Sequence, residues 1–127
     1  MLLLILFVLF YVVLQDKSLK VSSEEIVSSY EDNVAEADKI FLNKEINLTG
    51  KVKSFIQFEG EKSLLELESG NDSLKIYCLI LNKEIESKAA SLTTGTSVTV
   101  VGKCAGINLS LMNKLNNAIY IEAGQIK

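Results

Sequence analysis

Three aromatic residues could form a stacking surface for the bases of a single-stranded nucleic acid. Phe55, Tyr77 and Tyr120 each lie in a segment of alternating apolar and polar residues, on the side opposite to the main apolar face. Sites that bind single strands without sequence preference combine such aromatic side chains with positive charge along the phosphate backbone. The charge would come from four lysines in these and neighbouring segments: Lys51, Lys53, Lys75 and Lys103. These seven residues are the candidate ligand-binding set.

The charge of the chain argues against nucleic acid as the ligand of this set. Residues 22–127 contain 11 lysines, no arginine and 15 acidic residues, which gives a net charge of −4. Nucleic-acid binding depends on neutralising phosphates, so a negative domain begins with the wrong sign. Glu66 and Glu68 also lie between Phe55 and Tyr77, and the loop at 59–61 carries two further glutamates. We expect a protein, peptide or glycan partner, with single-stranded nucleic acid as the alternative.

The amino-acid composition excludes the common types of catalytic site. The 127 residues include no histidine, the usual proton carrier near neutral pH, and no arginine, the side chain best suited to bidentate phosphate binding. No serine stands three residues before a lysine, so a Ser-x-x-Lys nucleophile is absent as well. Two cysteines without histidine cannot complete a structural zinc site. We expect a protein that is not an enzyme and that uses no metal or cofactor.

The elements that must position the candidate residues begin with a helix. Ser22 and Glu25 match a capping box, in which the serine caps the helix and the glutamate reaches back to it. Apolar residues then recur at positions 26, 30, 34, 37 and 41, which places them on one stripe of a helix over residues 22–42. The period changes to two over residues 44–58, where Gly50 indicates a bent strand. Even positions in this strand share the inner face, so Phe55 is expected outside.

The remaining segments complete a five-stranded pattern. Further strands are predicted at residues 64–68, 73–81, 96–104 and 118–122, with a helix at 82–92 whose apolar residues are Ile85, Ala89 and Leu92. Three strands, a helix and two strands, with a long bent first strand, is the order of the five-stranded Greek-key barrel called the OB-fold. We predict a mainly β OB-fold barrel with an N-terminal helix and a helix between the third and fourth strands. An open α+β sheet with the same element order is the alternative.

Cys78 and Cys104 fall on the inner side of the third and fourth strands. In the OB-fold the fifth strand lies between these two, which separates the cysteines by roughly 9 to 10 Å. A disulfide requires Cα atoms within about 7 Å. We expect two buried thiols and keep a disulfide as the alternative, because barrel curvature could shorten the separation.

The first fourteen residues form an uninterrupted apolar run, MLLLILFVLFYVVL, that ends at Gln15, Asp16 and Lys17. As a helix this run would be about 21 Å long, short of the roughly 30 Å hydrocarbon core, which is typical of a signal-peptide core. It lacks a basic segment in front, a small-residue cleavage site behind and a cysteine for lipid attachment. We predict an apolar anchor helix that is not cleaved, rather than a buried core helix. Residues 1–21 are then an anchor or signal-like segment with a hinge, followed by a domain at 22–127.

Short motifs along the domain follow one another with the order and spacing of a known family. They are Tyr30, Asn33, Ala37, Asp38 and Phe41 in the N-terminal helix, Thr49-Gly50-Lys51-Val52 in the first strand, and Gly102-Lys103-Cys104-Ala105-Gly106 in the fourth. These motifs resemble the tRNA-anti-like family of small bacterial OB-fold proteins, which are mostly exported proteins or lipoproteins. Relatives often place a second cysteine in the last strand, where this chain has Gly124, and the lipobox cysteine is absent. The resemblance implies an OB-fold and an exported protein, and it supplies no ligand.

The expected location combines the anchor with this exported context. We expect a membrane-anchored protein whose barrel lies outside the cytoplasm. Lys17 and Lys20 oppose this orientation, because the positive-inside rule taken alone would keep them in the cytoplasm. Two lysines are too few to set the orientation.

Overall fold

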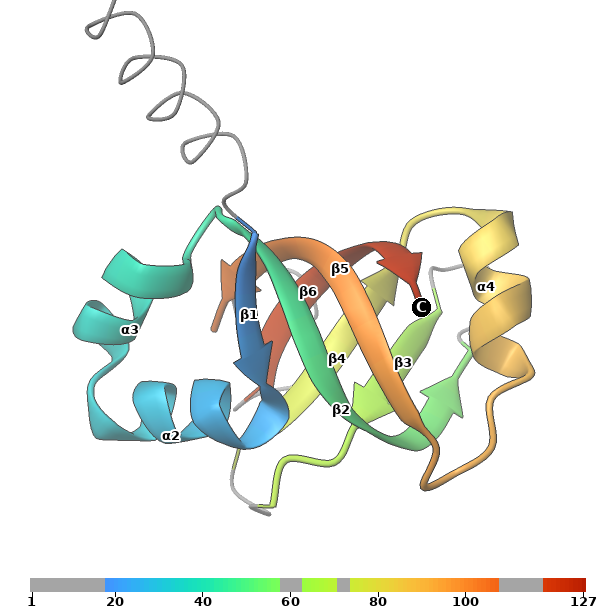
Figure 1. The fold of residues 1–127 in the computed structure, drawn as a ribbon, viewed down its shortest axis with the longest axis horizontal. Helices are drawn as coiled ribbons and strands as arrows, with labels where there is room; N and C mark the ends of the chain where they lie inside the picture. Colours follow the sequence, from blue (N-terminus) through green and yellow to red (C-terminus); the bar gives the residue numbers. More distant parts are fainter. Residues whose placement is uncertain (1–17, 58–62, 71–73, 108–117) are drawn as a thin grey trace, which may run out of the picture.

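The computed structural model describes residues 18–57, 63–70, 74–107 and 118–127, which form a β-barrel with helices at two sides (Figure 1). The elements in chain order are β1 (Leu19–Ser22), α2 (Ser23–Asp32), α3 (Val34–Phe41), β2 (Glu45–Ile56), β3 (Leu64–Leu67), β4 (Lys75–Ile80), α4 (Lys83–Ala90), β5 (Ser97–Gly106) and β6 (Ala118–Ile126). The predicted anchor at 1–14 and the glutamate loop at 59–61 lie outside the described residues. Among the residues described, no helix is both long and apolar enough to span a bilayer.

The barrel closes because β2 pairs with strands on both of its sides. The sheet order is β2-β3-β4-β6-β5, and β5 returns to β2 in antiparallel register, with Leu48 opposite Val100. The β4–β6 pair is parallel, as the OB-fold order requires. This arrangement confirms the predicted fold, including the pairing of the predicted first and fourth strands. A strand that was not predicted, β1, pairs in parallel with β2 and places Leu19 beside Ile46.

The predicted N-terminal helix is two helices. Its start is as expected, since the Ser22 hydroxyl accepts a hydrogen bond from the Glu25 N–H at 3.1 Å and the Glu25 carboxylate accepts one from the Ser22 N–H at 3.4 Å. The helix breaks at Asn33, whose extended backbone ends α2 and whose side chain caps α3 by accepting from the Glu36 N–H at 3.1 Å. Asparagine favours such caps because its side chain competes for nearby backbone groups. The break leaves Val34 47% exposed, although the predicted stripe would bury it.

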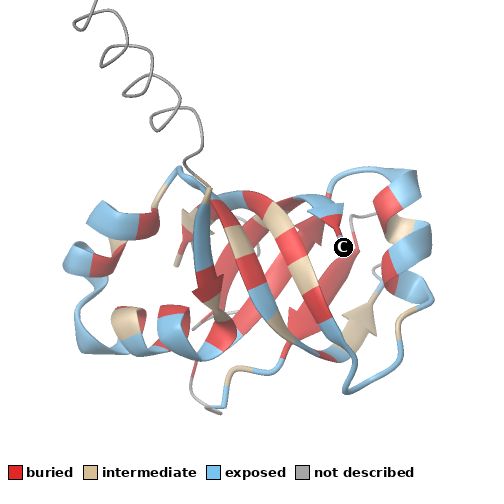
Figure 2. Cartoon of the chain, viewed as in Figure 1, coloured by how far each residue is buried: buried red, intermediate tan, exposed pale blue. Residues whose placement is uncertain are grey.

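The barrel interior and both flanking sets of helices share one apolar core (Figure 2). The helix pair contributes Ile26, Tyr30, Ala37 and Phe41 to it. On another side α4 begins at the predicted cap, where Asn82 accepts from the Ile85 N–H at 2.9 Å. Ile85 and Ala89 are buried, and Leu92 packs half-buried against the same core.

A bulge in β2 reverses the predicted side of Phe55. The register of β2 against β3 shifts between Val52 and Ser54. Beyond the shift Phe55 stands opposite Leu65, and both pack with the main core. The prediction that Phe55 faces outward is wrong, because one extra residue moves a period-two pattern to the opposite face.

Candidate ligand-binding face

Two of the three predicted aromatic residues meet on the outer wall of the barrel. Tyr77 of β4 and Tyr120 of β6 stand opposite each other in the parallel pair. Their ring centroids are 5.9 Å apart and their planes are inclined at 33°. Their strand neighbours Ile76 and Ile121 pack in the interior, so the alternation predicted the outer side of both tyrosines correctly. Phe55 does not join them, because it packs with the interior core.

Both tyrosines are buried although they lie on the outer wall. Tyr77 is 3% exposed and Tyr120 is 0% exposed. They belong to a second apolar cluster, which also contains Leu64, Leu79 and Ala118 and against which Ile56 and Ala105 pack. Burial raises the pKa of Tyr120, and the neighbouring Tyr77 adds to this effect. A base stacks on an accessible ring face. In this arrangement the pair is therefore part of a packed cluster and not an open stacking surface.

One candidate lysine, Lys53, is paired with a glutamate that stands opposite Tyr77. Glu66 stands opposite Tyr77 on the neighbouring strand, and its carboxylate lies 3.5 Å from the Lys53 ammonium. The same carboxylate accepts a hydrogen bond from the Ser54 hydroxyl at 3.2 Å. Glu66 is 6% exposed, and a carboxylate so enclosed requires such partners. Lys53 therefore adds no net positive charge beside the tyrosines.

The other three candidate lysines are separated in the register of the sheet. Lys51 pairs across with the start of β5, and Lys75 is the first residue of β4. Lys103 of β5 stands between two glutamates, Glu45 of β2 and Glu122 of β6. Along this part of the wall the charges alternate across the strands. Within the described chain, the four lysines thus do not form a continuous positive track.

An open basin of about 650 Å³ lies on the wall around Lys103. It is lined by Asn43, Glu45, Leu81, Val101, Gly102, Lys103, Glu122, Gly124 and Gln125. Leu81 is 47% exposed and Val101 is half-exposed, so the basin offers apolar area between charged groups. The sequence pattern placed Lys103 on the outer side. It could not reveal the basin, which depends on the register of three strands and on the segment after β4.

The motif residues of the helices and of β5 form a buried contact. The Tyr30 hydroxyl donates to Asp38 Oδ1 at 2.8 Å and lies 3.8 Å from the Cys104 sulfur. Gly106 has a φ of 69°, and a Cβ there would lie 3.1 Å from Asp38 Oδ1, so both conformation and space favour glycine. The backbone of Cys104 exchanges two hydrogen bonds with residues 43 and 44. These contacts hold the helix pair against the barrel.

Both cysteines are buried free thiols, as predicted. Ile121 of β6 stands opposite Cys78 on one side and Cys104 on the other, so one strand separates the two sulfur atoms. Burial raises the pKa of Cys78 to about 12 and also raises the pKa of Cys104. The thiolate is the reactive form of cysteine, so neither residue is prepared as a nucleophile near neutral pH. Among the described residues, no three potential metal ligands of the His, Cys, Asp or Glu type lie together.

The chain resembles solved structures at low sequence identity, whereas no curated protein matches it. A candidate nucleic acid-binding lipoprotein from Klebsiella pneumoniae subsp. pneumoniae MGH 78578 has 12% identity and a TM-score of 0.60, over 87% of this chain and 90% of that one. A candidate aspartyl-tRNA synthetase from Leishmania major Friedlin has 11% identity and a TM-score of 0.58, over 87% and 20%. The asparaginyl-tRNA synthetase from Pyrococcus horikoshii has 16% identity and a TM-score of 0.52, over 69% and 19%. The chain thus spans about a fifth of either synthetase, and these likenesses show the fold.

A family match covers nearly the whole chain. The family described as tRNA_anti-like matches residues 2–119. This range includes four of the five barrel strands and the first two residues of β6, together with the contact of Tyr30, Asp38 and Cys104. The match agrees with the motifs that first indicated the resemblance. The chain therefore belongs to the tRNA-anti-like family of OB-fold proteins.

Proposed function

We propose that this chain is a non-catalytic OB-fold binding module, tethered to a membrane through residues 1–14, whose partner is a protein or peptide. The main observation in support of this proposal is the burial of Tyr77 and Tyr120. Because the two rings are already packed in an apolar cluster, the wall formed by β4 and β6 does not present them for base stacking. The partner is then expected at a different part of the outer wall.

The basin around Lys103 suits a polypeptide better than a phosphate backbone. Glu45 and Glu122 flank Lys103 on the two neighbouring strands. A ligand in the basin would therefore meet two carboxylates beside the one ammonium group. Phosphates would be repelled by this balance. Leu81 and Val101 add apolar area next to these charges. Protein interfaces commonly combine apolar contact with a polar rim in this way.

The absence of catalysis is supported by the chemistry of the buried groups. The pKa values of both thiols are raised, which opposes nucleophilic use of either sulfur. The two synthetases match this chain over about a fifth of their own length, so their catalytic activity is not implied by the likeness. The lipoprotein description of the Klebsiella neighbour supports the membrane tether.

Single-stranded nucleic acid is the second candidate ligand. Membership of the tRNA-anti-like family favours it, and so does the description of the Klebsiella neighbour as nucleic acid-binding. Tyr77 also lies on the outer side of β4, the third barrel strand, which belongs to the face that OB-folds use for oligonucleotides. Binding in this mode would require the two rings to become accessible.

Photo-cross-linking of the full-length protein in membranes of its source would test the proposal. A photoreactive residue replaces Gln125, which lines the basin, and in the matched control it replaces Lys51, which is also exposed but lies on β2 outside the basin. We expect a discrete protein adduct from position 125 only, and its loss in Val101→Glu. Equal adducts at both positions, or an adduct removed by nuclease, would contradict a protein partner at the basin.

A further inference from the structure

We infer that one corner of the domain lies on the membrane surface and recognises anionic phospholipid headgroups. The corner consists of Leu19, Lys20, Lys39, Ile40 and Lys44, and is called the entry corner below. This inference rests on the proposed tether through residues 1–14. It adds which surface of the domain faces the bilayer and which lipid chemistry that surface prefers.

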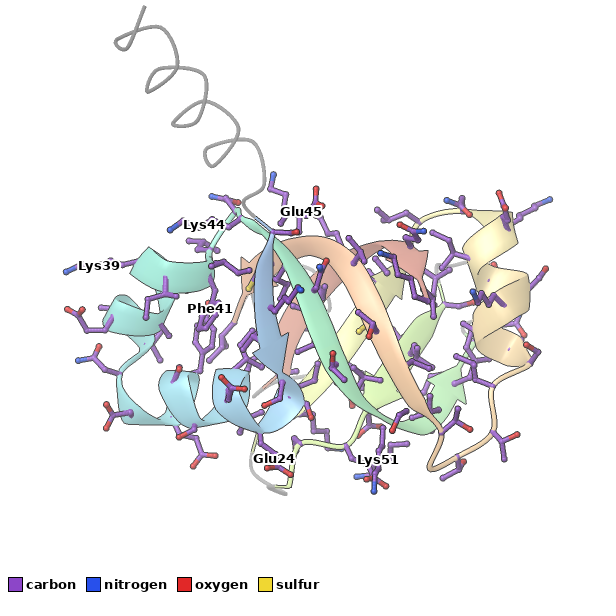
Figure 3. All side chains as sticks on the ribbon, in the orientation of Figure 1. Glu24, Lys39, Phe41, Lys44, Glu45 and Lys51 are labelled. Atoms are coloured by element: carbon purple, nitrogen blue, oxygen red, sulfur yellow. The ribbon has the colours of Figure 1, made fainter. Side chains whose placement is uncertain are left out.

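The register of β1 brings the start of the described chain to the start of β2. Leu19 stands beside Ile46, and the Asn47 side-chain amide lies 3.5 Å from the Ser18 hydroxyl. The chain therefore enters the domain next to residue 44. Figure 3 shows Lys44 and Glu45 beside this end of β1, whereas Lys51, in the middle of β2, lies well away from it.

The last turn of α3 reaches the same corner. The Lys44 ammonium donates a hydrogen bond to the Lys39 carbonyl oxygen at 3.0 Å, which ties the start of β2 to the end of α3. Ile40 follows Lys39 in this turn. Val34 lies at the other end of the same helix, six residues earlier and about 9 Å away along the axis. The entry corner thus includes the C-terminal end of α3, whereas the N-terminal end with Val34 lies outside it.

Exposed apolar side chains accompany the lysines at this corner. Leu19 is 36% exposed and Ile40 is 48% exposed, and the described chain has four large apolar residues so exposed. An isoleucine on a helix surface that also carries lysines can enter the headgroup layer, while the long lysine side chains reach the phosphates. Leu19 and Ile40 therefore provide the apolar contact with the bilayer, and the lysines provide the positive charge.

The local charge has the opposite sign to that of the whole domain. The exposed charges at the corner are Lys20, Lys39 and Lys44 against Glu36 and Glu45. A third carboxylate, Asp38, is partly buried and accepts a hydrogen bond from the Tyr30 hydroxyl at 2.8 Å, so it is directed toward the core. Glu36 pairs with Lys39 at 3.1 Å, but both side chains are more than 60% exposed, so water screens the pair. A basic surface next to a membrane segment is attracted to anionic lipids. The rest of the domain is acidic and is repelled, which orients the corner toward the bilayer.

The sequence ahead of the corner argues for lipid as the occupant. Fourteen uncharged residues end at Leu14, and only residues 15–17 lie between this run and Ser18. The four residue steps from Leu14 to Ser18 span at most about 14 Å. If the run is inserted in the bilayer, the entry corner must remain close to the headgroups. A partner protein or a second copy would have to displace this contact.

The test uses the full-length chain with a polarity-sensitive dye at one introduced cysteine. Ile40→Cys reports on the entry corner, and Val34→Cys is the matched control because Val34 is 47% exposed on the same helix. Cys78 and Cys104 are 0% exposed, so the dye reacts with the introduced thiol. The protein is reconstituted in vesicles of phosphatidylcholine, with or without an equal part of phosphatidylglycerol. Flotation of the vesicles is measured alongside the emission spectrum and its quenching by brominated acyl chains.

We expect flotation in both lipids, and a blue shift with quenching at position 40 only in vesicles that contain phosphatidylglycerol. The double variant Lys20→Gln/Lys39→Gln should lose the shift and still float. Protein that does not float would remove the tether and this inference with it. Floating protein with an unshifted dye at position 40, or an equal shift at position 34, would refute the corner while the tether stands. A shift that persists in pure phosphatidylcholine would refute recognition of anionic headgroups, and one that follows protein concentration in detergent would identify a second copy instead.

Discussion

Replacing Gly102 by alanine should destabilise the barrel at the β5–β6 pair. A Cβ atom at this position would overlap the carbonyl oxygen of Glu122 and lie 2.9 Å from its carbonyl carbon and 3.1 Å from the Ala123 Cα. All three are backbone atoms of the neighbouring strand, so a rotamer change cannot relieve the overlap. Overpacking a buried site costs about 3 kcal/mol when the backbone must move. For a domain of this size each 1 kcal/mol lowers Tm by about 4 °C or more, so we expect a fall of about 12 °C.

Gly124→Ala is the matched control for this prediction. Gly124 lies on the same pair of strands, but a Cβ there would meet only the Val101 carbonyl oxygen, at an ordinary 3.6 Å. We expect the free energy of unfolding of this variant to stay within about 0.5 kcal/mol of the parent. Thermal unfolding followed by circular dichroism measures both variants. A Gly102→Ala protein that melts within a few degrees of the parent, or equal losses in both variants, would refute the close approach of β5 and β6.

Four further predictions concern Phe55, Tyr30 and the two cysteines. Phe55→Ala should cost about 2 kcal/mol in urea unfolding, since the half-buried ring packs with the core, and an unchanged midpoint would support the outward position instead. Tyr30→Phe should lower the free energy of unfolding by about 1 to 2 kcal/mol because it removes the donor to Asp38, and no loss would show that the contact is not stabilising. Cys78 and Cys104 should resist a thiol reagent at pH 8 and both react after unfolding, and rapid reaction of the native protein would contradict their burial. Burial raises the folded-state pKa of Cys78 from 9.0 to about 12. The contribution of this thiol to stability is therefore complete below pH 9 and is lost as the pH rises toward 12. We expect the free energy of unfolding to fall over this pH range, and to fall less steeply in Cys78→Ala.

The sequence predicted the elements that depend on local signals. The capping box at Ser22 and the Asn82 cap are both present, since each needs only a few neighbouring residues. The alternation also assigned the correct outer side to Tyr77 and Tyr120. The order of elements was enough to predict the closed barrel, because few topologies accommodate a long bent first strand that pairs twice.

The failures arise where distant contacts decide the outcome. The bulge between Val52 and Ser54 has no clear local signal, and it moved Phe55 to the interior. Strand β1 forms by pairing with the edge of β2, a distant contact, so the sequence pattern predicted a hinge up to residue 21 and a helix cap at Ser22. The burial of Tyr77 and Tyr120 could not be read from alternation, which gives the side of a strand and not what packs over it. For this reason the seven candidate ligand-binding residues were assembled on a face that the fold does not present as one site.

The sequence around Asn33 is compatible both with a continuous helix and with a break between two helices. The apolar stripe of period 3.6 continues on both sides of Asn33, from Ile26 to Phe41, and this favoured one continuous helix. The Asn33 side chain also matches an N-cap, with Glu36 three residues later, and this local preference prevailed. The cap allows α3 to turn so that Ala37 and Phe41 are buried against the core.

Titration of a labelled oligothymidylate into the full-length protein in detergent micelles tests the central claim most directly. The measurement is made at low salt, where electrostatic binding to single strands is strongest. We predict no binding at micromolar protein concentrations, because Tyr77 and Tyr120 are packed in an apolar cluster and the domain is acidic. Micromolar binding that weakens with added salt and with Tyr77→Ala, in a variant shown to be folded by its melting curve, would contradict the account and establish nucleic acid as the ligand.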